Sequence, residues 1–339
     1  MTKDVAKVGI LLLNLGGPDS LEAVRPFLFN LFSDREIIRL GPSFLQKPLA
    51  YLISTLRHKK TESYYKLIEG KSPILEITQR QAKALEKVLN DSLLTIHNSR
   101  SFKVFIGMRY WHPLIEEVVP EIHHQGIKRV LALGLYPHYS VATTGSSFSK
   151  MKDVVSRFPI DVFTISSWHD NPLYIDSLVE SIKKGLDNFG TSASNLHPLP
   201  NDVHILFSAH SLPKKFIEEG DPYLEHIRGT INEITKRIKI TWDLSFQSKS
   251  GPVEWLEPST DEMIKELAGR GVKNLLVVPI SFVSDHIETL YEIDILYKRM
   301  AESLGMRLRR TESLNASPLF ISALSGIVKK GVEEAGWAE

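Results

Sequence analysis

The sequence predicts an α/β protein made of two similar domains, each a parallel sheet flanked by helices. Short apolar runs rich in β-branched residues, such as 275–280 (LLVVPI), alternate with segments of helical apolar spacing. The same plan occurs twice. Residues 171–185 match 317–331 at an offset of 146, and 126–128 match 271–273 at an offset of 145. We therefore predict a duplicated domain, with a ligand in the cleft between the copies.

The opening segments of the two copies are further apart than the later ones. Residues 8–18 begin the first copy and 203–213 begin the second, at an offset of 195. Because the later offsets are near 145, the first copy holds about 50 additional residues. We expect a lip-like insertion at about residues 40–60.

The individual elements follow from the same apolar spacing. We expect strands at 8–15, 103–107, from 126, at 205–207 and at 275–280, and helices at 21–32, 76–89 and 114–123.

A polar stretch, residues 187–202, separates the copies and predicts the domain boundary. The expected domains are residues 1–187 and 188–339. The last helix, at about 318–334, is expected to cross to the first domain.

The insertion has an apolar face that ends in a basic cluster. Apolar residues recur at helical spacing through 41–60, and Arg57, Lys59 and Lys60 close the segment. This pattern is typical of a core-facing helix. Spacing alone favours this interpretation; the alternative is a helix that lies in a membrane interface or covers an apolar ligand.

The composition is that of a globular protein without a membrane span or a basic face. Hydrophobic residues make up 42% of the 339 residues and charged residues 24%, and the net charge is +1. No apolar run approaches the roughly 18 residues of a spanning helix. The balanced charge gives no electrostatic argument for nucleic acid.

The first residues and the cysteine content indicate the compartment and the metal chemistry. Residues 1–17 carry no small-residue cleavage site, and we interpret them as the start of a first strand in a cytosolic protein. The sequence has no cysteine, which excludes disulfides, zinc–thiolate sites and cysteine-ligated iron–sulfur clusters.

Three carboxylates follow the apolar run 275–280. An α-helix starting at about Asp285 would put Asp285, Glu288 and Glu292 on one face, with His286 and Tyr291 beside them. Open α/β sheets bind ligands at the carboxyl ends of their strands, where this cluster lies. The stripe therefore predicts a path for protons or metal ions, although a solvated helix flank has the same spacing.

A histidine ends another predicted strand. His210 comes directly after 205–207, so it is expected at the same sheet edge as Glu288. An imidazole beside carboxylates suits the removal of protons from a weakly acidic ligand. A hydrolase triad with Ser208 is the alternative, but no Gly-x-Ser-x-Gly elbow is present. Trp255 and Phe282 offer flat faces for a large planar ligand.

With these motifs the sequence resembles the ferrochelatase family from residue 8 to about 330. The matching motifs are LNLGGP at 13–18, SPI at 72, GMRYWHP from 107, YPHYS and TTGSS, FSAHSLP around His210, GDPY at 220–223, QSKSGPVEWLEP from 247 and SDHIETLYEID from 284.

The resemblance implies two Rossmann-like, chelatase-type domains that clamp a porphyrin under the insertion. It also implies the insertion of ferrous iron, as a substrate, into protoporphyrin IX, with no organic cofactor. His210 would accept pyrrole protons or bind iron, and Glu288 would work with it. The other matched positions are Asp285, His286 and Glu292 for the polar path; Arg109 and Tyr110 on the opposite wall, for iron delivery; Leu15, Tyr65, Trp255 and Phe282 along the macrocycle; and Arg57 and Ser72 near the propionates.

The sequence departs from the family pattern in two places. Leu296 stands where many relatives carry a further carboxylate, and the lip reads Leu56-Arg57 where relatives have paired arginines. The expected partners are the porphyrin, Fe²⁺ and a membrane surface, but no nucleic acid. The expected protein is a monomer or homodimer in the cytoplasm, peripheral at the inner membrane.

Three alternatives remain open at this point: a coproporphyrin-using ferrochelatase, a cobalt or nickel chelatase, and a two-lobed metal or haem carrier without turnover. The apolar lip favours protoporphyrin, which has two carboxylates, over a substrate with four.

Overall fold

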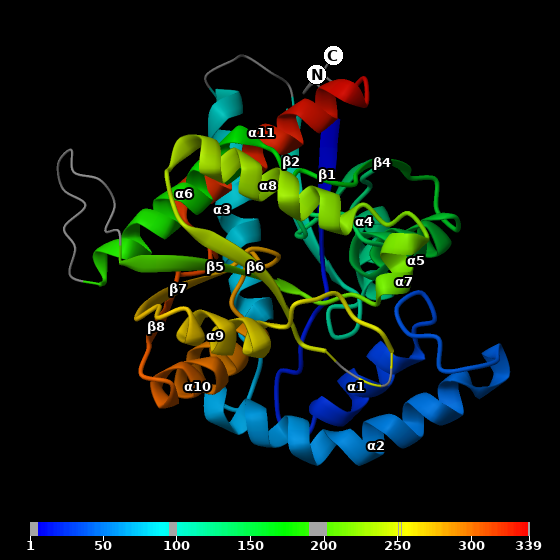
Figure 1. Cartoon of the computed structure of the whole chain (residues 1–339). Coiled ribbons are helices and arrows are strands. Elements are labelled where there is room, and N and C mark those ends of the chain that lie inside the picture. The colour runs from blue at the N-terminus through cyan, green and yellow to red at the C-terminus, as the bar shows by residue number, and fades with distance from the viewer. Residues whose placement is uncertain (1–5, 95–99, 190–201, 250, 252, 338–339) are drawn as a thin grey trace. The chain divides into compact units, whose positions relative to one another are not determined.

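The computed structural model describes residues 6–94, 100–189, 202–249, 251 and 253–337 (Figure 1). The chain forms two compact units, Met1–Trp168 with Asn315–Glu339, and His169–Leu314. Residues 1–5 and most of the predicted linker, residues 190–201, lie outside the described residues.

The first unit is built on a four-stranded parallel sheet. Its strand order is β2-β1-β3-β4, with Leu11 of β1 placed between Phe105 of β2 and Ala132 of β3. The strands are β1 (Ala6–Asn14), β2 (Arg100–Met108), β3 (Arg129–Gly134) and β4 (Asp161–Ile165).

The helices of the first unit follow the predicted spacing. They are α1 (Val24–Ser33), α2 (Gln46–Tyr65), α3 (Ile74–Leu94), α4 (Ile115–His124), α5 (Ser146–Val155) and α11 (Pro318–Glu334). The 3₁₀ turns η1 (Ser43–Leu45) and η2 (Lys66–Ile68) flank α2, and the π-helix η3 (Val141–Gly145) precedes α5.

The second unit repeats this plan with the strand order β6-β5-β7-β8, again fully parallel. Its strands are β5 (Val203–His210), β6 (Trp242–Gln247), β7 (Asn274–Pro279) and β8 (Arg307–Arg310). Its helices are α6 (Pro172–Asp187), α7 (Lys214–Glu218), α8 (Tyr223–Arg237), α9 (Thr260–Gly269), α10 (Lys298–Ser303) and the π-helix η4 (Glu288–Tyr297).

The two sheets therefore have the same strand order, and the strands within each are parallel, which confirms the predicted α/β fold with a duplicated parallel sheet. Each third strand, β3 or β7, is followed by a π-helix. The central strands are apolar on both faces: the successive residues Leu11 and Leu12 of β1, and Leu276 and Val277 of β7, are fully buried.

The last helix of each sequence repeat, α6 or α11, has a glycine at the equivalent position, and each glycine packs against a strand. A Cβ at Gly185 of α6 would lie 2.9 Å from Leu276 of β7, and a Cβ at Gly331 of α11 would lie 2.7 Å from Leu131 of β3. Both helices thus pack tightly on a third strand. In consequence α6 belongs to the second unit and α11 to the first, so the division after Trp168 falls one helix before the expected boundary at 187.

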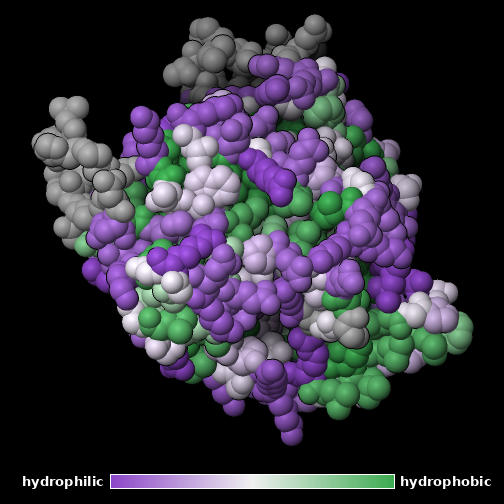
Figure 2. All heavy atoms as spheres, in the orientation of Figure 1, coloured by the Kyte–Doolittle hydropathy of each residue, from purple (hydrophilic) through white to green (hydrophobic). Residues whose placement is uncertain are grey.

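The insertion is the long helix α2 with η1 before it. Its apolar side chains are strongly exposed: Phe44 is 76% exposed and Leu56 is 72% exposed, with Tyr51 and Leu52 also exposed. Figure 2 shows hydrophobic side chains gathered over the η1 end of α2. This face of the helix is not part of the core of its unit.

Among the residues that the structure describes, no helix combines the length and the apolar character needed to cross a membrane.

Candidate active site

His210 is the last residue of β5 and lies at the carboxyl edge of the second sheet. Its backbone is held from two sides. The amide of His210 donates to Ser281 Oγ at 2.9 Å, and Tyr223 Oη donates to the His210 carbonyl at 3.0 Å. These two hydrogen bonds fix the backbone at the end of β5, and so they fix the position from which the His210 side chain extends.

The His210 side chain is paired with Glu288. His210 Nδ1 lies 2.8 Å from Glu288 Oε2, and since a carboxylate only accepts, Nδ1 carries the hydrogen. The imidazole is 36% exposed and the carboxylate 15% exposed. Burial opposes the charged imidazolium, but the charge of Glu288 outweighs it and raises the pKa of His210.

The same pairing acts on the carboxyl group. Burial opposes ionisation of Glu288, yet the charge and hydrogen bond of His210 lower its pKa to about 2. The pair is thus a hydrogen-bonded histidine–carboxylate couple in which Glu288 is ionised at neutral pH. When the His210 ring is neutral with its hydrogen on Nδ1, the second imidazole nitrogen has a lone pair for a proton or a ligand.

Ser248 connects Glu288 to Glu292. Its hydroxyl oxygen lies 2.6 Å from Glu288 Oε2 and 2.7 Å from Glu292 Oε2. Gln247 Nε2 donates to the Glu288 carbonyl at 3.1 Å and to Glu292 Oε2 at 3.2 Å. Ser248 adopts a φ of 68°, a left-handed conformation that costs free energy in a residue with a side chain. The turn after β6 is therefore held in place by this site.

Glu292 differs from Glu288 in its proton affinity. Burial, together with the nearby charge of Glu288, raises the pKa of Glu292 to about 7. Two carboxyl groups joined by one hydroxyl thus have widely separated pKa values, a pattern typical of sites that move protons.

The helix that carries Glu288 and Glu292 differs from the predicted one. The expected α-helix from Asp285 is instead a π-helix that begins at Glu288, and Asp285 lies before it. Glu288 and Glu292 share Ser248, as expected for neighbours. The Asp285 carboxylate is held by Arg310 at 3.0 Å, so the expected face of three stacked carboxylates is wrong.

His286 lies beside the pair and is buried. Its Nε2 lies 3.9 Å from Glu288 Oε1, and its ring packs edge to face with Phe282 at 4.4 Å between centroids. Burial lowers the pKa of His286, so the ring is neutral at neutral pH. Phe282 also packs edge to face with His210, at 6.4 Å.

In the first unit, Arg109 and Tyr110 follow β2 and converge on Asp34. Asp34 Oδ2 accepts from Arg109 Nη2 at 2.6 Å, from Tyr110 Oη at 2.7 Å and from Ser146 Oγ at 2.5 Å. Burial opposes ionisation of Asp34, but these donors lower its pKa. Burial raises the pKa of Tyr110, so the phenol stays protonated.

The other residues matched to the porphyrin site fall into buried and exposed groups. Tyr65 and Ser72 are buried, and the Ser72 amide donates to the Pro18 carbonyl at 2.8 Å, beside the Gly-Gly-Pro turn. Arg57 is exposed, with its guanidinium 5.5 Å from the Phe32 ring centroid.

Leu15, in the first unit, and Trp255, in the second, are partly buried. The indole Nε1 of Trp255 is buried and has no hydrogen-bond partner among the described residues.

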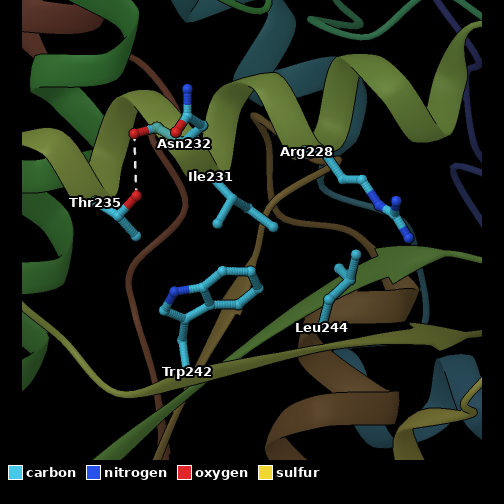
Figure 3. A pocket seen from close by; sticks show the side chains of 6 residues that line it. All are labelled: Arg228, Ile231, Asn232, Thr235, Trp242 and Leu244. Atoms are coloured by element: carbon cyan, nitrogen blue, oxygen red, sulfur yellow. Dashed lines mark hydrogen bonds between the residues drawn. The ribbon is translucent and has the colours of Figure 1, made fainter.

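A separate groove on the second unit is apolar and carries no acid–base group. It has a volume of about 380 Å³ and lies between α8 and the edge strand β6 (Figure 3). Its lining residues are Arg228, Ile231, Asn232, Thr235, Trp242 and Leu244. The acid–base groups lie instead at the strand ends.

The structure brings the predicted residues His210, Glu288 and Glu292 together, and two residues that hold site groups were not predicted. Ser248 follows β6 directly, so the strand-end rule that identified His210 would also have identified it. Asp34 lies at the end of α1 and has no comparable signal. Among the described residues, no group of three or more His, Asp or Glu side chains forms a ready metal cage.

Known proteins resemble this chain over nearly its whole length. A ferrochelatase family model matches residues 7–332. A ferrochelatase from Geobacter metallireducens is 53% identical over 328 residues, which cover 96% of this chain and 98% of that protein. A ferrochelatase from Geotalea daltonii is 50% identical over 327 residues, covering 95% and 97%.

Among solved structures, SirB from Bacillus subtilis with Fe³⁺ superposes with a TM-score of 0.54 over 98% of both chains. At 13% identity this likeness shows the fold alone. The family model and the two relatives agree over almost every described element, and on that basis the chain belongs to the ferrochelatase family.

Proposed function

We propose that this protein inserts Fe²⁺ into protoporphyrin IX, giving protohaem and two protons in the last step of haem synthesis. The observation that best supports the proposal is the hydrogen-bonded chain that runs from His210 through Glu288 and Ser248 to Glu292. Metal insertion requires the loss of two pyrrole N–H protons, and this chain offers an acceptor and a route for them.

In this mechanism His210 is the base. The nitrogen that Glu288 does not occupy takes a pyrrole proton, and the imidazolium formed is stabilised by the carboxylate 2.8 Å away. Glu288 remains ionised because its pKa is about 2. Glu292, with a pKa of about 7, can accept a proton through Ser248 and release it near neutral pH.

Iron would use the same groups before transfer. An imidazole nitrogen and a carboxylate oxygen are ligands that Fe²⁺ accepts, so His210 and Glu288 are proposed to hold it. His286 and Glu292 continue the polar path, and Arg109 and Tyr110 are proposed to serve iron delivery from the first unit. No organic cofactor takes part.

The macrocycle itself needs flat apolar walls and anchors for its two propionates. We assign the walls to Leu15, Tyr65, Trp255 and Phe282, whose aromatic and aliphatic faces suit a planar ring. Arg57 and Ser72 are assigned to the propionates, with Arg57 exposed at the insertion. A pocket that binds the ring bent would expose the nitrogen lone pairs and favour the transition state.

The insertion is proposed to bind a membrane surface. Its exposed side chains Phe44, Tyr51, Leu52 and Leu56 form an apolar strip, and Arg57 and the lysines after it add positive charge for anionic lipid headgroups. This geometry favours peripheral attachment of a cytoplasmic protein at the inner membrane, where an apolar porphyrin dissolves.

The proposal is tested by anaerobic turnover of the purified protein with Fe²⁺, with protoporphyrin and coproporphyrin supplied in parallel. We expect metallation of protoporphyrin and its loss, by about a hundredfold or more, in His210→Ala. His204→Ala is the matched control, because His204 is on the same strand and also pairs with a carboxylate, Asp243 at 2.9 Å. Turnover of coproporphyrin alone, or porphyrin binding without turnover, would contradict the proposal.

A further inference from the structure

The end of β8 carries an arginine, mostly shielded from solvent, that binds two aspartates at once. The Arg310 side chain is 10% exposed. Its Nε and Nη2 donate to the two carboxylate oxygens of Asp294 at 3.0 and 2.8 Å. Its Nη1 donates to Asp285 Oδ1 at 3.0 Å. All three nitrogens of the guanidinium thus contact a carboxylate, a geometry that a lysine cannot reproduce.

The two aspartates lie on either side of the catalytic carboxylates in the sequence. Asp285 precedes η4 and Asp294 lies within it, with Glu288 and Glu292 between them. Arg310 therefore connects both flanks of this segment to the edge strand β8, which contacts η4.

The network around Asp285 is closed on its other sides. Asp285 Oδ1 also accepts from Ser313 Oγ at 2.7 Å and from Thr289 Oγ1 at 3.1 Å. Thr289 is fully buried on η4 itself. The carboxylate that precedes the helix is thereby joined to its first turn as well as to β8.

A conformation as rare as η4 needs such support. π-helical segments are usually single turns inside α-helices, whereas η4 has 10 residues. A π turn holds about one residue more than an α turn, so reversion to α-helix would rotate Glu292 relative to Glu288. The two carboxylates would stay neighbours, but the distances from Ser248 and His210 to them would change.

We propose that Arg310 is a positioning residue for metal insertion. By holding Asp285 and Asp294, it fixes η4 in the form in which Glu288 reaches His210 and Glu292 reaches Ser248. This inference rests on the proposed function. It assigns Asp285, which the family resemblance places in the polar path, to the anchor of the helix.

The test compares Arg310→Met with two matched variants. Arg309→Met removes the neighbouring arginine of the same strand, whose guanidinium lies 5.8 Å from the Phe189 ring. Ile234→Ala removes a fully buried side chain from α8 and destabilises the second unit without touching η4. Each variant is assayed well below its melting temperature for kcat, for KM and for hydrogen exchange of residues 285–297.

In Arg310→Met we expect kcat to fall by about tenfold to a hundredfold, with KM changed by less than about threefold. We also expect faster exchange in η4 than in the β5 amides. Ile234→Ala and Arg309→Met should keep kcat and η4 exchange near the wild-type values. Arg310→Lys keeps the charge without the fork, so it should recover melting temperature more than kcat.

Two results would overturn the proposal: wild-type kcat and η4 exchange in folded Arg310→Met, or a loss of kcat no greater than that in Ile234→Ala. Absence of porphyrin turnover in the wild type would refute the proposed function instead. The exchange measurement would still test whether Arg310 holds η4.

Discussion

Replacement of Glu292 by glutamine should stabilise the protein in alkaline solution while impairing the proposed reaction. Burial and the charge of Glu288 raise the pKa of Glu292 from 4.5 to about 7. The folded state therefore resists ionisation of this carboxyl group more than the unfolded state does. Glutamine keeps the shape and never ionises, so it removes that penalty.

The magnitude follows from the shift in pKa. One pKa unit corresponds to about 1.4 kcal/mol, so the shift of Glu292 costs folding about 3 kcal/mol once the group is ionised. The Glu292 side chain is partly exposed, and solvent screening reduces this to about 2 kcal/mol.

The sign depends on pH in a definite window. Between about 4.5 and 7 the folded state binds the proton that the unfolded state has released, so the contribution of Glu292 to stability falls as pH rises. The free energy of unfolding of Glu292→Gln should match that of the wild type near pH 4. It should exceed the wild-type value by about 2 kcal/mol at pH 8.

Urea unfolding, followed by tryptophan fluorescence at several pH values, measures this difference. Glu302→Gln is the control, because Glu302 is an exposed residue on α10, directly after η4. It should leave the pH dependence of stability unchanged. If Glu292→Gln is no more stable than the wild type at pH 8, the raised pKa of Glu292 and its role as a proton acceptor are refuted.

Three further predictions test other parts of the site. Ser248→Ala breaks the connection between the carboxylates and should lower kcat by about tenfold or more, with the pH profile of kcat shifted; an unchanged profile would remove Ser248 from the relay. Asp34→Asn leaves the partly buried Arg109 guanidinium without its counter-charge and should cost about 3 kcal/mol of stability in a thermal melt. A loss of stability below about 1 kcal/mol would mean that Asp34 and Arg109 interact as weakly as a solvent-exposed ion pair. The double variant Phe44→Ser with Leu56→Ser should weaken sedimentation with anionic vesicles by about tenfold or more, and unaltered sedimentation would exclude the strip as the membrane contact.

Much of the fold was predictable because it depends on local apolar patterns. Buried parallel strands such as β1 and β7 are continuous apolar runs, and the repeat of 171–185 at 317–331 predicted the duplication. The packing of each terminal helix was less predictable. A polar stretch indicates a loop, but it does not show that α6 packs on β7 of the second sheet.

The candidate site also has a part that the sequence predicts and a part that it does not. His210 and Glu288 follow strands, so the strand-end rule and the motifs around them predict their place. The π-helix left only a weak trace: its buried residues Thr289, Ile293 and Tyr297 are spaced by four, slightly more than the α-helical period.

The ion pairs between residues far apart in the sequence could not be predicted from it. Asp34 and Arg109 are 75 residues apart, and Arg310 and Asp285 are 25 residues apart. No local pattern encodes such pairs, because they depend on which strands the sheet places side by side. Sequence spacing therefore predicted the candidate acid–base groups but not the residues that hold them.

The measurement that tests the account most directly is a double-mutant cycle on the central pair, with kcat for protoporphyrin metallation as the readout. His210→Ala, Glu288→Gln and the double variant are compared with the wild type under anaerobic conditions. If imidazole and carboxylate remove the proton as one unit, each single variant should lose about a hundredfold or more, and the double variant should be little slower than His210→Ala. Losses that multiply in the double variant would mean that the two residues act independently, and would contradict the proposed mechanism.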